Sequence, residues 1–422
     1  MKLTKCKLGE LVNVTRGMSL SGQYYSEKGE LIRLTLGNFN MNGGGFKKNT
    51  SKSDLYFTGP VREEFILKKG DIITPLTEQS LGLLGTTARI PESGKYIQSQ
   101  DVALVKCKPG KIDPNFCYYL VSSHSVKQQL SAAAQQTKIR HTSPEKIMNC
   151  TVWVPELQEQ ERIGALLTAI DSKIELNCSI NRNLEALAKQ LYDYWFVQFD
   201  FPDENGRPYK SSGGKMVWNE VLKREAPEGW KVYSLAELGC FKNGINYSKD
   251  EIGDKDYKIV NVRNISSSSI FIDNSGLDVL TLKRNGGDNY LVKESDILIA
   301  RSGVPGATRL LRDVENNIIY CGFIICYSIS NIDNKPILFY TLKQLESVTK
   351  SQSNGSILSN ISQDVLKQLC VVLPDIKVKG LFNEMINKVF SLIQNNQRMI
   401  DNLIKQRDEL LPLLMNGQVT IE

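Results

Sequence analysis

Two long stretches of the chain carry apolar residues at alternating spacings of four and three. The second stretch starts this series at Phe382 and ends it at Leu414, and subtracting 219 from each number gives a matching series in the first half. Such spacing is typical of a coiled-coil seam and predicts two long helices that pack along it. The seam positions taken to pair the helices are Ile163, Ile170, Asn177, Leu184, Leu191, Ile386, Ile393, Asn396, Leu403 and Leu410.

An asparagine interrupts the apolar seam at the same position of each series, Asn177 in the first and Asn396 in the second. The apolar seam residues are sufficiently explained as core. A buried amide is stable only in an alignment that gives it a partner, so we expect these two residues to fix the register of the helices. A single helix with this stripe would expose it, whereas two in one chain can cover each other.

The region before each helix has a different pattern, with β-branched and aromatic runs broken by clusters of Gly, Asn and Ser. Such runs predict short strands and turns, and Pro155 and Pro374 close the two strand-rich regions. We therefore expect an α+β protein with two similar globular regions and two long helices. The predicted segments are a globular region 1–155, a helix 156–199, a linker 200–226, a globular region 227–374 and a helix with tail 375–422.

The two halves also share words in a constant order, which indicates an internal duplication. Residues 4–17 align with 231–244, residues 34–39 with 260–265, and residues 70–75 with 295–300. Residues 111–120 then align with 331–340 and residues 143–155 with 362–374, so the offset falls only from 227 to 219. Each match is weak alone, and their constant order supports duplication.

Composition narrows the function classes. A chain of 422 residues predicts two or three domains, and its net charge of +6 permits an anionic partner. The nine cysteines include no CxxC pair, so we expect reduced thiols, and two histidines, His124 and His141, make a zinc site improbable. No apolar run of membrane-spanning length and no apolar signal-peptide core occur, which predicts a cytoplasmic protein without membrane contact.

The motifs of common catalysts are missing or incomplete. The nearest approach to a phosphate-binding loop, "SSGGKMV", has Met216 where Ser or Thr is required. Residues 374–377, "PDIK", superficially resemble the end of a metal-dependent nuclease site, but the pattern places no acidic partner upstream and the first half has "PELQ" instead. We therefore expect a protein that is not an enzyme and binds no metal.

Several longer motifs occur together in one order, namely "VPELQEQERIGALLTAIDSKIELN", "LAKQLYDYWFVQFDFPDENGRPYKSSGGKMVWNE", "APEGWKVYSLAEL" and "LIKQRDELLPLLMNGQVTI". With these motifs the chain resembles the specificity subunits of type I restriction-modification systems. The resemblance implies that each globular half is a target recognition domain reading one part of a bipartite DNA sequence. It also implies antiparallel helices that dock two methyltransferase subunits, and through them restriction subunits. S-adenosylmethionine, magnesium and ATP would then be bound only by the partner subunits.

The residues that read DNA are expected in polar loops at matching places of the two halves, because Arg, Lys, Asn, Gln and Ser recognise base edges and phosphates. One loop precedes each "SPEK" or "SQDV" element, and a second follows "GDII" or "SDIL". With Arg16 and Arg263, the predicted DNA-binding set is Arg16, Gln79, Ser80, Gln135, Gln136, Lys138, Arg140, His141, Arg263, Arg301, Ser302, Gln352, Ser353 and Asn354.

Two alternatives stay open at this stage. A stand-alone DNA methyltransferase or nuclease would bind its own metal or S-adenosylmethionine. A coiled-coil scaffold without a DNA role would show no preference among DNA sequences, and the polar loop residues would then be merely solvated.

Overall fold

A computed structural model of the chain describes residues 1–40, 44–50, 52–78, 82–133, 140–247, 253–283, 285–352 and 360–421. The chain divides into two compact units. Unit 1 comprises Met1–Asn177 with Met399–Glu422, and unit 2 comprises Cys178–Arg398. Each unit therefore combines one strand-rich region with one segment of each long helix.

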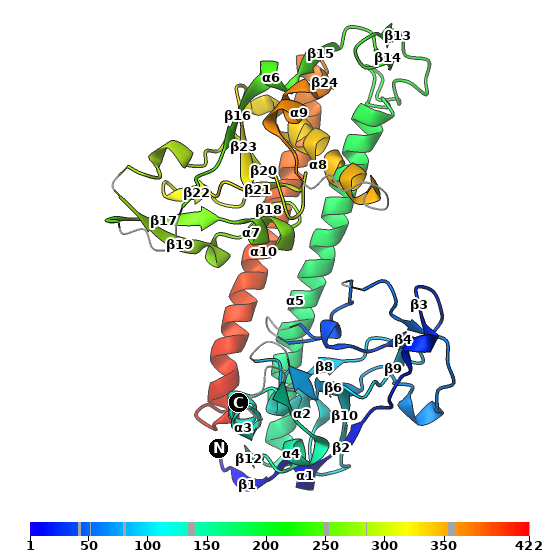
Figure 1. The fold of residues 1–422 in the computed structure, drawn as a ribbon, viewed down its shortest axis with the longest axis vertical. Helices are drawn as coiled ribbons and strands as arrows, with labels where there is room; N and C mark the ends of the chain where they lie inside the picture. Colours follow the sequence, from blue (N-terminus) through cyan, green and yellow to red (C-terminus); the bar gives the residue numbers. More distant parts are fainter. Residues whose placement is uncertain are drawn as a thin grey trace. The chain divides into compact units, whose positions relative to one another are not determined.

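Unit 1 is built around a four-stranded sheet of order β2-β10-β6-β8 (Figure 1). A second four-stranded sheet has the order β3-β5-β4-β9, and the pairs β1-β12 and β7-β11 complete the strands. The strands are β1 (Thr4–Lys7), β2 (Val12–Arg16), β3 (Tyr25–Ser26), β4 (Ile32–Arg33), β5 (Tyr56–Phe57), β6 (Ile72–Pro75), β7 (Thr77–Glu78), β8 (Ala88–Arg89), β9 (Tyr96–Ile97), β10 (Val102–Cys107), β11 (Arg140–His141) and β12 (Thr151–Val154). The helices are α1 (Leu8–Leu11), α2 (Pro114–Val121), α3 (His124–Ala133), α4 (Pro144–Met148) and the first part of α5 (Leu157–Tyr192).

Unit 2 has a five-stranded sheet of order β16-β23-β20-β21-β18 and a three-stranded sheet of order β19-β17-β22. The pairs β15-β24 and β13-β14 lie outside these sheets. The strands are β13 (Met216–Asn219), β14 (Arg224–Pro227), β15 (Lys231–Ser234), β16 (Gly239–Asn243), β17 (Lys255–Val260), β18 (Phe271–Ile272), β19 (Asp278–Leu282), β20 (Asp296–Ala300), β21 (Thr308–Leu311), β22 (Ile318–Tyr320), β23 (Ile324–Ile329) and β24 (Cys370–Leu373). The helices are α6 (Leu235–Leu238), α7 (Val262–Ser267), α8 (Lys335–Gln352), α9 (Gln363–Gln368) and α10 (Ile376–Met415), whose last residues belong to unit 1.

The two strand-rich regions share one plan, which confirms the α+β class and the two similar globular regions. The order β2-β10-β6-β8 returns as β16-β23-β20-β21. The outer pair β1-β12 aligns Thr4 with Val154, and β15-β24 aligns Lys231 with Leu373 at the equivalent residues. A parallel pair, β4 with β9, has its counterpart in β17 with β22.

A glycine marks the same close approach of two backbones in each unit. A Cβ added to Gly17 would lie 2.3 Å from the carbonyl oxygens of residues 98 and 99, and one added to Gly244 would lie 2.2 Å from the oxygen of Cys321. The residue after each glycine donates a backbone hydrogen bond across this contact, Met18 at 3.1 Å and Ile245 at 3.0 Å. Only a residue without a side chain fits here, which explains why glycine stands at both positions.

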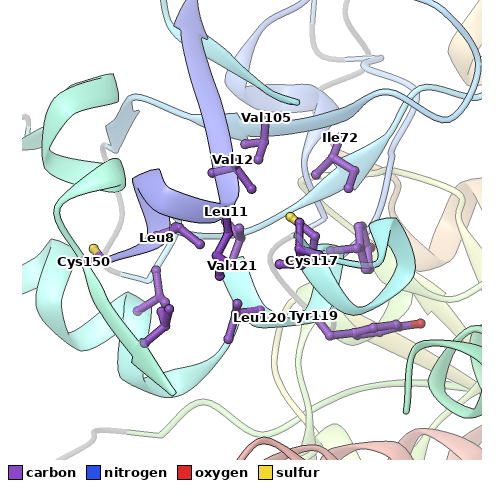
Figure 2. Close-up of a cluster of buried hydrophobic side chains, with 14 of the residues drawn as sticks. Leu8, Leu11, Val12, Ile72, Val105, Cys117, Tyr119, Leu120, Val121 and Cys150 are labelled. Carbon is purple, nitrogen blue, oxygen red and sulfur yellow. The ribbon is translucent and has the colours of Figure 1, made fainter. Parts of the chain in front are cut away.

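The core of unit 1 joins the central sheet to α2 and the long helices. Figure 2 shows Leu8, Leu11 and Val12 facing Cys117 and Val121 of α2. The same cluster includes three buried helix residues, Ile163 and Leu167 of α5 and Leu414 of α10. The seam residues of unit 1 therefore bury their apolar surface against the strand-rich region as well as against each other.

The core of unit 2 is rich in aromatic rings. Phe382 of α10 is fully buried, with ring centroids of Trp195 at 5.6 Å and Phe196 at 4.7 Å. Tyr192 lies 6.4 Å from the same ring and stacks on Tyr340 of α8. Large aromatic side chains therefore pack the end of α5 and the turn after it against α8 and α10.

Within each unit the two long helices run antiparallel. In unit 1, Asp171 contacts Arg407 and Asn177 contacts Met399, so rising numbers on α5 meet falling numbers on α10. In unit 2, Asn181 contacts Asn396 while Tyr192 contacts Phe382. Of the predicted pairing residues, Ile163, Ile170, Ile386 and Ile393 are buried, and the half-buried ones are Asn177, Leu184, Leu191, Asn396, Leu403 and Leu410.

The partner of Asn396 is Asn181, not Asn177. The Asn396 amide donates to Asn181 Oδ1 at 3.1 Å, and Asn181 is buried. Asn177 donates to the carbonyl of Lys173 on its own helix and lies 3.4 Å from the Met399 sulfur. The stagger of the antiparallel helices places neighbouring seam positions, rather than equivalent ones, opposite each other.

Replacing Asn396 by leucine is expected to lower the free energy of unfolding by about 1–3 kcal/mol, because the buried Asn181 oxygen loses its donor. Replacing Asn181 and Asn396 together should be nearly neutral, because no unpaired amide remains. Urea unfolding of Asn396→Leu, Asn181→Leu and the double variant measures this difference. Asn177→Leu serves as the control and should cost less than either single change at the pair, and equal losses for all variants would contradict a paired role.

A polar network in unit 1 has no polar counterpart in unit 2. Tyr119 of α2 donates to Asp171 Oδ2 at 2.6 Å, and Arg407 Nη1 donates to Asp171 Oδ1 at 3.0 Å. Burial and the nearby carboxylate raise the pKa of the Tyr119 hydroxyl. At the equivalent positions unit 2 has Phe339, Phe390 and Ala188, with the two rings 6.0 Å apart. The contact between the long helices and the helix of the strand-rich region is therefore polar in unit 1 and apolar in unit 2.

Candidate nucleic-acid interface

The structure brings the two predicted loops of the first half together. Strand β11 pairs with β7, so Arg140 lies opposite Glu78 and His141 opposite Thr77. The backbone of Thr142 continues this contact by donating to the Leu76 carbonyl at 2.8 Å. We call Thr77, Glu78, Arg140 and His141 the first surface. The segments were predicted separately, and their pairing makes them one site.

Arg140 is positioned by side chains beneath it. Its Nη1 donates to Ser131 Oγ at 3.1 Å and lies 3.8 Å from Glu78 Oε1. Glu78 is only 3% exposed, and its Oε2 accepts backbone hydrogen bonds from residues 82–84 at 3.0–3.2 Å. The carboxylate therefore holds the backbone of residues 82–84 and positions a half-buried guanidinium, leaving the rest of the Arg140 donor fork available to a ligand.

Unit 2 repeats this arrangement at the backbone level. The N–H of Ile361 donates to the Arg301 carbonyl at 3.0 Å, which is the counterpart of the bond between Thr142 and Leu76. The Arg301 N–H in turn donates to the Phe323 carbonyl at 2.9 Å, as Leu76 does to Asp101 at 2.8 Å. We call Arg301, Ser302, Phe323 and Ile361 the second surface. Arg301 and Ser302 are half-buried there.

The remaining predicted residues lie in different settings. Arg16 is exposed at the end of β2. The pKa of the Glu145 carboxyl is lowered mainly by a hydrogen bond with Ser143, and the positive charge of Arg16 adds to this effect. Arg263 is exposed but forms an ion pair with Asp278, so its charge is partly neutralised. His141 is exposed. Seven predicted residues lie outside the described part of the chain, namely Gln79, Ser80, Gln135, Gln136, Lys138, Ser353 and Asn354.

The predicted loop that starts at Thr349 begins later in the structure. Helix α8 extends to Gln352, whose side chain is outside the described part. Residues 349–352 contain neither Gly nor Pro, so nothing in them ends a helix that starts at Lys335. The first predicted loop also shortens, because α3 continues to Ala133 and β11 takes Arg140 and His141.

Two exposed apolar features are not among the residues predicted from the sequence. The first is Phe323, which lies in the second surface. The second is an exposed apolar stripe on the outer side of α5 and the π-helical turn after it (Asp193–Val197), formed by Ile180, Leu187 and Tyr194. These three residues recur every seven positions, so a search for a second heptad stripe beside the seam would have found them.

Lys343, whose pKa is strongly perturbed, is engaged in contacts within unit 2. Burial lowers the pKa of Lys343 to about 8, but its Nζ donates to the Ser269 carbonyl at 2.6 Å and lies 3.6 Å from Glu346. Glu346 is also held by two hydrogen bonds from the buried Arg309. In the described ranges, no group of three or more His, Cys, Asp or Glu residues could hold a metal ion.

The cysteines and the helices add two further facts. All nine cysteines are free thiols. Among the helices of the described ranges, none combines the length and apolar character needed to cross a membrane.

Comparison with known proteins gives concordant matches. The family model described as "Type I restriction modification DNA specificity domain" matches residues 2–186 and 227–406. The type I restriction enzyme MjaIX specificity subunit of Methanocaldococcus jannaschii is 24% identical over 318 residues, covering 73% of this chain and 69% of that protein. The HindI specificity subunit of Haemophilus influenzae is 20% identical over 416 residues, covering 85% and 89%. A crystal structure of the S subunit from M. genitalium has a similar fold, with a TM-score of 0.55, 17% identity and coverage of 98% and 96%.

Proposed function

We propose a function from the premise that this chain belongs to the type I restriction-modification DNA specificity family, whose model matches both of its halves. The chain is the subunit of a type I restriction-modification system that recognises DNA sequence. Its two strand-rich regions are the recognition domains. The single observation that carries this function is the repetition of one sheet and one loop-to-loop backbone contact in both halves.

Duplication suits a bipartite target. Two similar readers in one chain match two parts of one duplex, as the two subunits of a symmetric dimer match two half-sites. The first surface of unit 1 and the second surface of unit 2 are proposed as the base-reading groups. Arg140 and Arg301 each carry a planar donor fork that fits the O6 and N7 acceptors of guanine. Arg16 and Arg263 are proposed as contacts to the phosphate backbone.

The long helices are proposed as the docking site for two methyltransferase subunits, one for each half of the duplication. Ile180, Leu187 and Tyr194 support this, because an exposed heptad stripe beside a filled seam is suited to a further helix. Restriction subunits would join through the methyltransferases. We propose that this chain is not itself catalytic, and that S-adenosylmethionine, magnesium and ATP are bound by the partners. The proposed location is the cytoplasm, where such a complex meets DNA.

The experiment that tests the function is a domain exchange. Residues 1–155 are replaced by the same region of a relative with a different target, and the chain is expressed with its partner subunits in a host that lacks other methyltransferases. Genome-wide sequencing of methylated bases should show one changed half of the motif, with the other half and the spacer kept. The physical reason is that each surface lies wholly within one unit.

Exchange of residues 227–374 is the matched control and should change the opposite half. An exchange that alters both halves at once would show one composite reader. If no sequence preference is found, the scaffold alternative holds, and if the purified chain methylates or cleaves DNA alone, the enzyme alternative holds.

A further inference from the structure

We propose that Phe323 reads a base in the second half of the target by contacting the 5-methyl group of a thymine. The inference rests on the proposed function and deepens it, because it assigns a base-reading role to an apolar residue. It is carried by the exposure of the ring, the rigidity of its backbone and its place beside Arg301.

The Phe323 ring is left in solvent. The side chain is 63% exposed, it belongs to none of the buried clusters, and no ring contact involves it in the described part of the chain. Burying a phenylalanine side chain is worth roughly 1.5–3 kcal/mol, so a fold gains by covering it when it can. Its neighbours Cys321 and Ile324 are buried, which makes the exposure of this one residue specific.

The backbone below the ring is fixed by several segments. Ile324 donates to the Cys321 carbonyl at 2.9 Å and closes a tight turn around residues 321–324. Gly322 donates to the Ile245 carbonyl at 2.7 Å, and Phe323 accepts from Arg301 at 2.9 Å. A Cβ on Gly322 would lie 2.0 Å from Asn246 Oδ1, so the turn packs closely against that side chain. Phe323 therefore projects from a rigid support, which limits the entropy lost on binding.

The ring also lies where the proposed DNA contacts converge. One backbone hydrogen bond joins Phe323 to Arg301, and the next joins Arg301 to Ile361 at the end of the second polar loop. The backbone hydrogen bond makes Arg301 and Phe323 direct neighbours, so a positively charged residue and an apolar one are paired at this place. Such a pair suits a base edge that carries both a methyl group and polar atoms next to it.

The first half supports a base-reading role for Phe323, because it has a different side chain at the equivalent position. The residue equivalent to Phe323 is Asp101, whose carbonyl accepts the same backbone hydrogen bond, from Leu76. The backbone is thus the same in both units while the side chain changes from a carboxylate to an aromatic ring. Such a position can distinguish two half-sites. Because phenylalanine has no hydrogen-bonding group, the base-edge group that it can recognise in the major groove is the thymine methyl.

The test uses the complete methyltransferase complex assembled with this chain and the target defined by its methylated motif. Each thymine of the second half-site is replaced singly by deoxyuridine, which removes only the methyl group. Wild-type complex should lose about fourfold in affinity at one position. Phe323→Ala should bind the unmodified target about five- to tenfold more weakly and be insensitive to deoxyuridine at that position. Phe323→Leu should retain most of the affinity.

Val279→Ala is the matched control, because Val279 is 65% exposed on β19 of the same unit, and all its affinities should equal those of the wild type. Unchanged binding by Phe323→Ala, or a second half-site without a T·A pair, would overturn the proposal. An equal loss on target and scrambled DNA would also overturn it and indicate unspecific stacking or insertion between bases. If wild-type complex itself does not prefer its target, the proposed function fails, and this outcome is distinct from the others.

Discussion

Phe382→Ala is expected to lower the free energy of unfolding of unit 2 by about 3–5 kcal/mol, the usual cost of removing a buried phenylalanine. The side chain is fully buried among Tyr192, Trp195 and Phe196, so the last residue of α5 and two rings of the following π-helical turn lose their common neighbour on α10. Urea unfolding followed by tryptophan fluorescence reports on this site, because Trp195 lies 5.6 Å from the deleted ring. Assembly with the methyltransferase subunits should weaken in parallel, since the proposed docking stripe ends at Tyr194.

Leu381→Ala is the matched control. Leu381 precedes Phe382 on the same helix but is 42% exposed, so the change should cost less than about 1 kcal/mol. Similar losses for both variants would mean that the aromatic cluster does not determine the stability of this region.

Gly244→Ala is expected to destabilise unit 2 by about 3 kcal/mol or more, because the new Cβ would lie 2.2–2.4 Å from the carbonyl oxygens of Cys321 and Tyr320. Both obstacles are backbone atoms, so no side-chain rotation relieves the overlap. The segments must separate, which breaks the hydrogen bonds from Gly244 to Ile324 and from Ile245 to Tyr320. Hydrogen exchange should show early loss of protection at the amides of Gly244 and Ile245, which donate these two bonds, and urea unfolding should give the total loss.

Gly380→Ala is the control for Gly244→Ala and should stabilise the protein rather than destabilise it. Gly380 lies within α10, and a Cβ added there would meet nothing within 4 Å, so alanine should stabilise the helix by up to about 1 kcal/mol. A Gly244→Ala protein as stable as the wild type would show that the close approach of the two backbones is not required.

The long helices and the duplication could be predicted because their signals are local or repeated. Helices α5 and α10 begin at Leu157 and Ile376, two residues after Pro155 and Pro374, and the apolar spacing follows through both. The repeat was found from short words whose structural cause is now visible. Gly17 and Gly244 match because both sit at a backbone crossing, and Asn38 and Asn264 match because each side chain caps the turn before it.

Other features depend on contacts far apart in sequence. The stagger that pairs Asn396 with Asn181 is set by packing between the helices. The sequence repeat shows only that Asn177 and Asn396 are equivalent, and it does not show which residue lies opposite each of them. The predicted loops were placed in the right parts of the chain, but nothing local shows that Arg140 pairs with Glu78. Phe323 was missed because it lies in the apolar run "CGFIICY", where a phenylalanine is indistinguishable from core until its exposure is known.

The polar network of unit 1 makes the two halves of this chain unequal partners. A homodimer built from two first halves would place Asp171 opposite Ala188 instead of Arg407, leaving a carboxylate without its cation. A homodimer of two second halves would place Arg407 opposite Phe390, so Arg407 would lose Asp171 and keep only Asp408 of its own helix as a carboxylate partner. Either homodimer would lose the ion pair between Asp171 and Arg407, which lies in a partly buried place where an opposite charge matters most. Each half is therefore better matched to the other half of the same chain than to a second copy of itself, so the divergence of the repeat favours pairing within one chain.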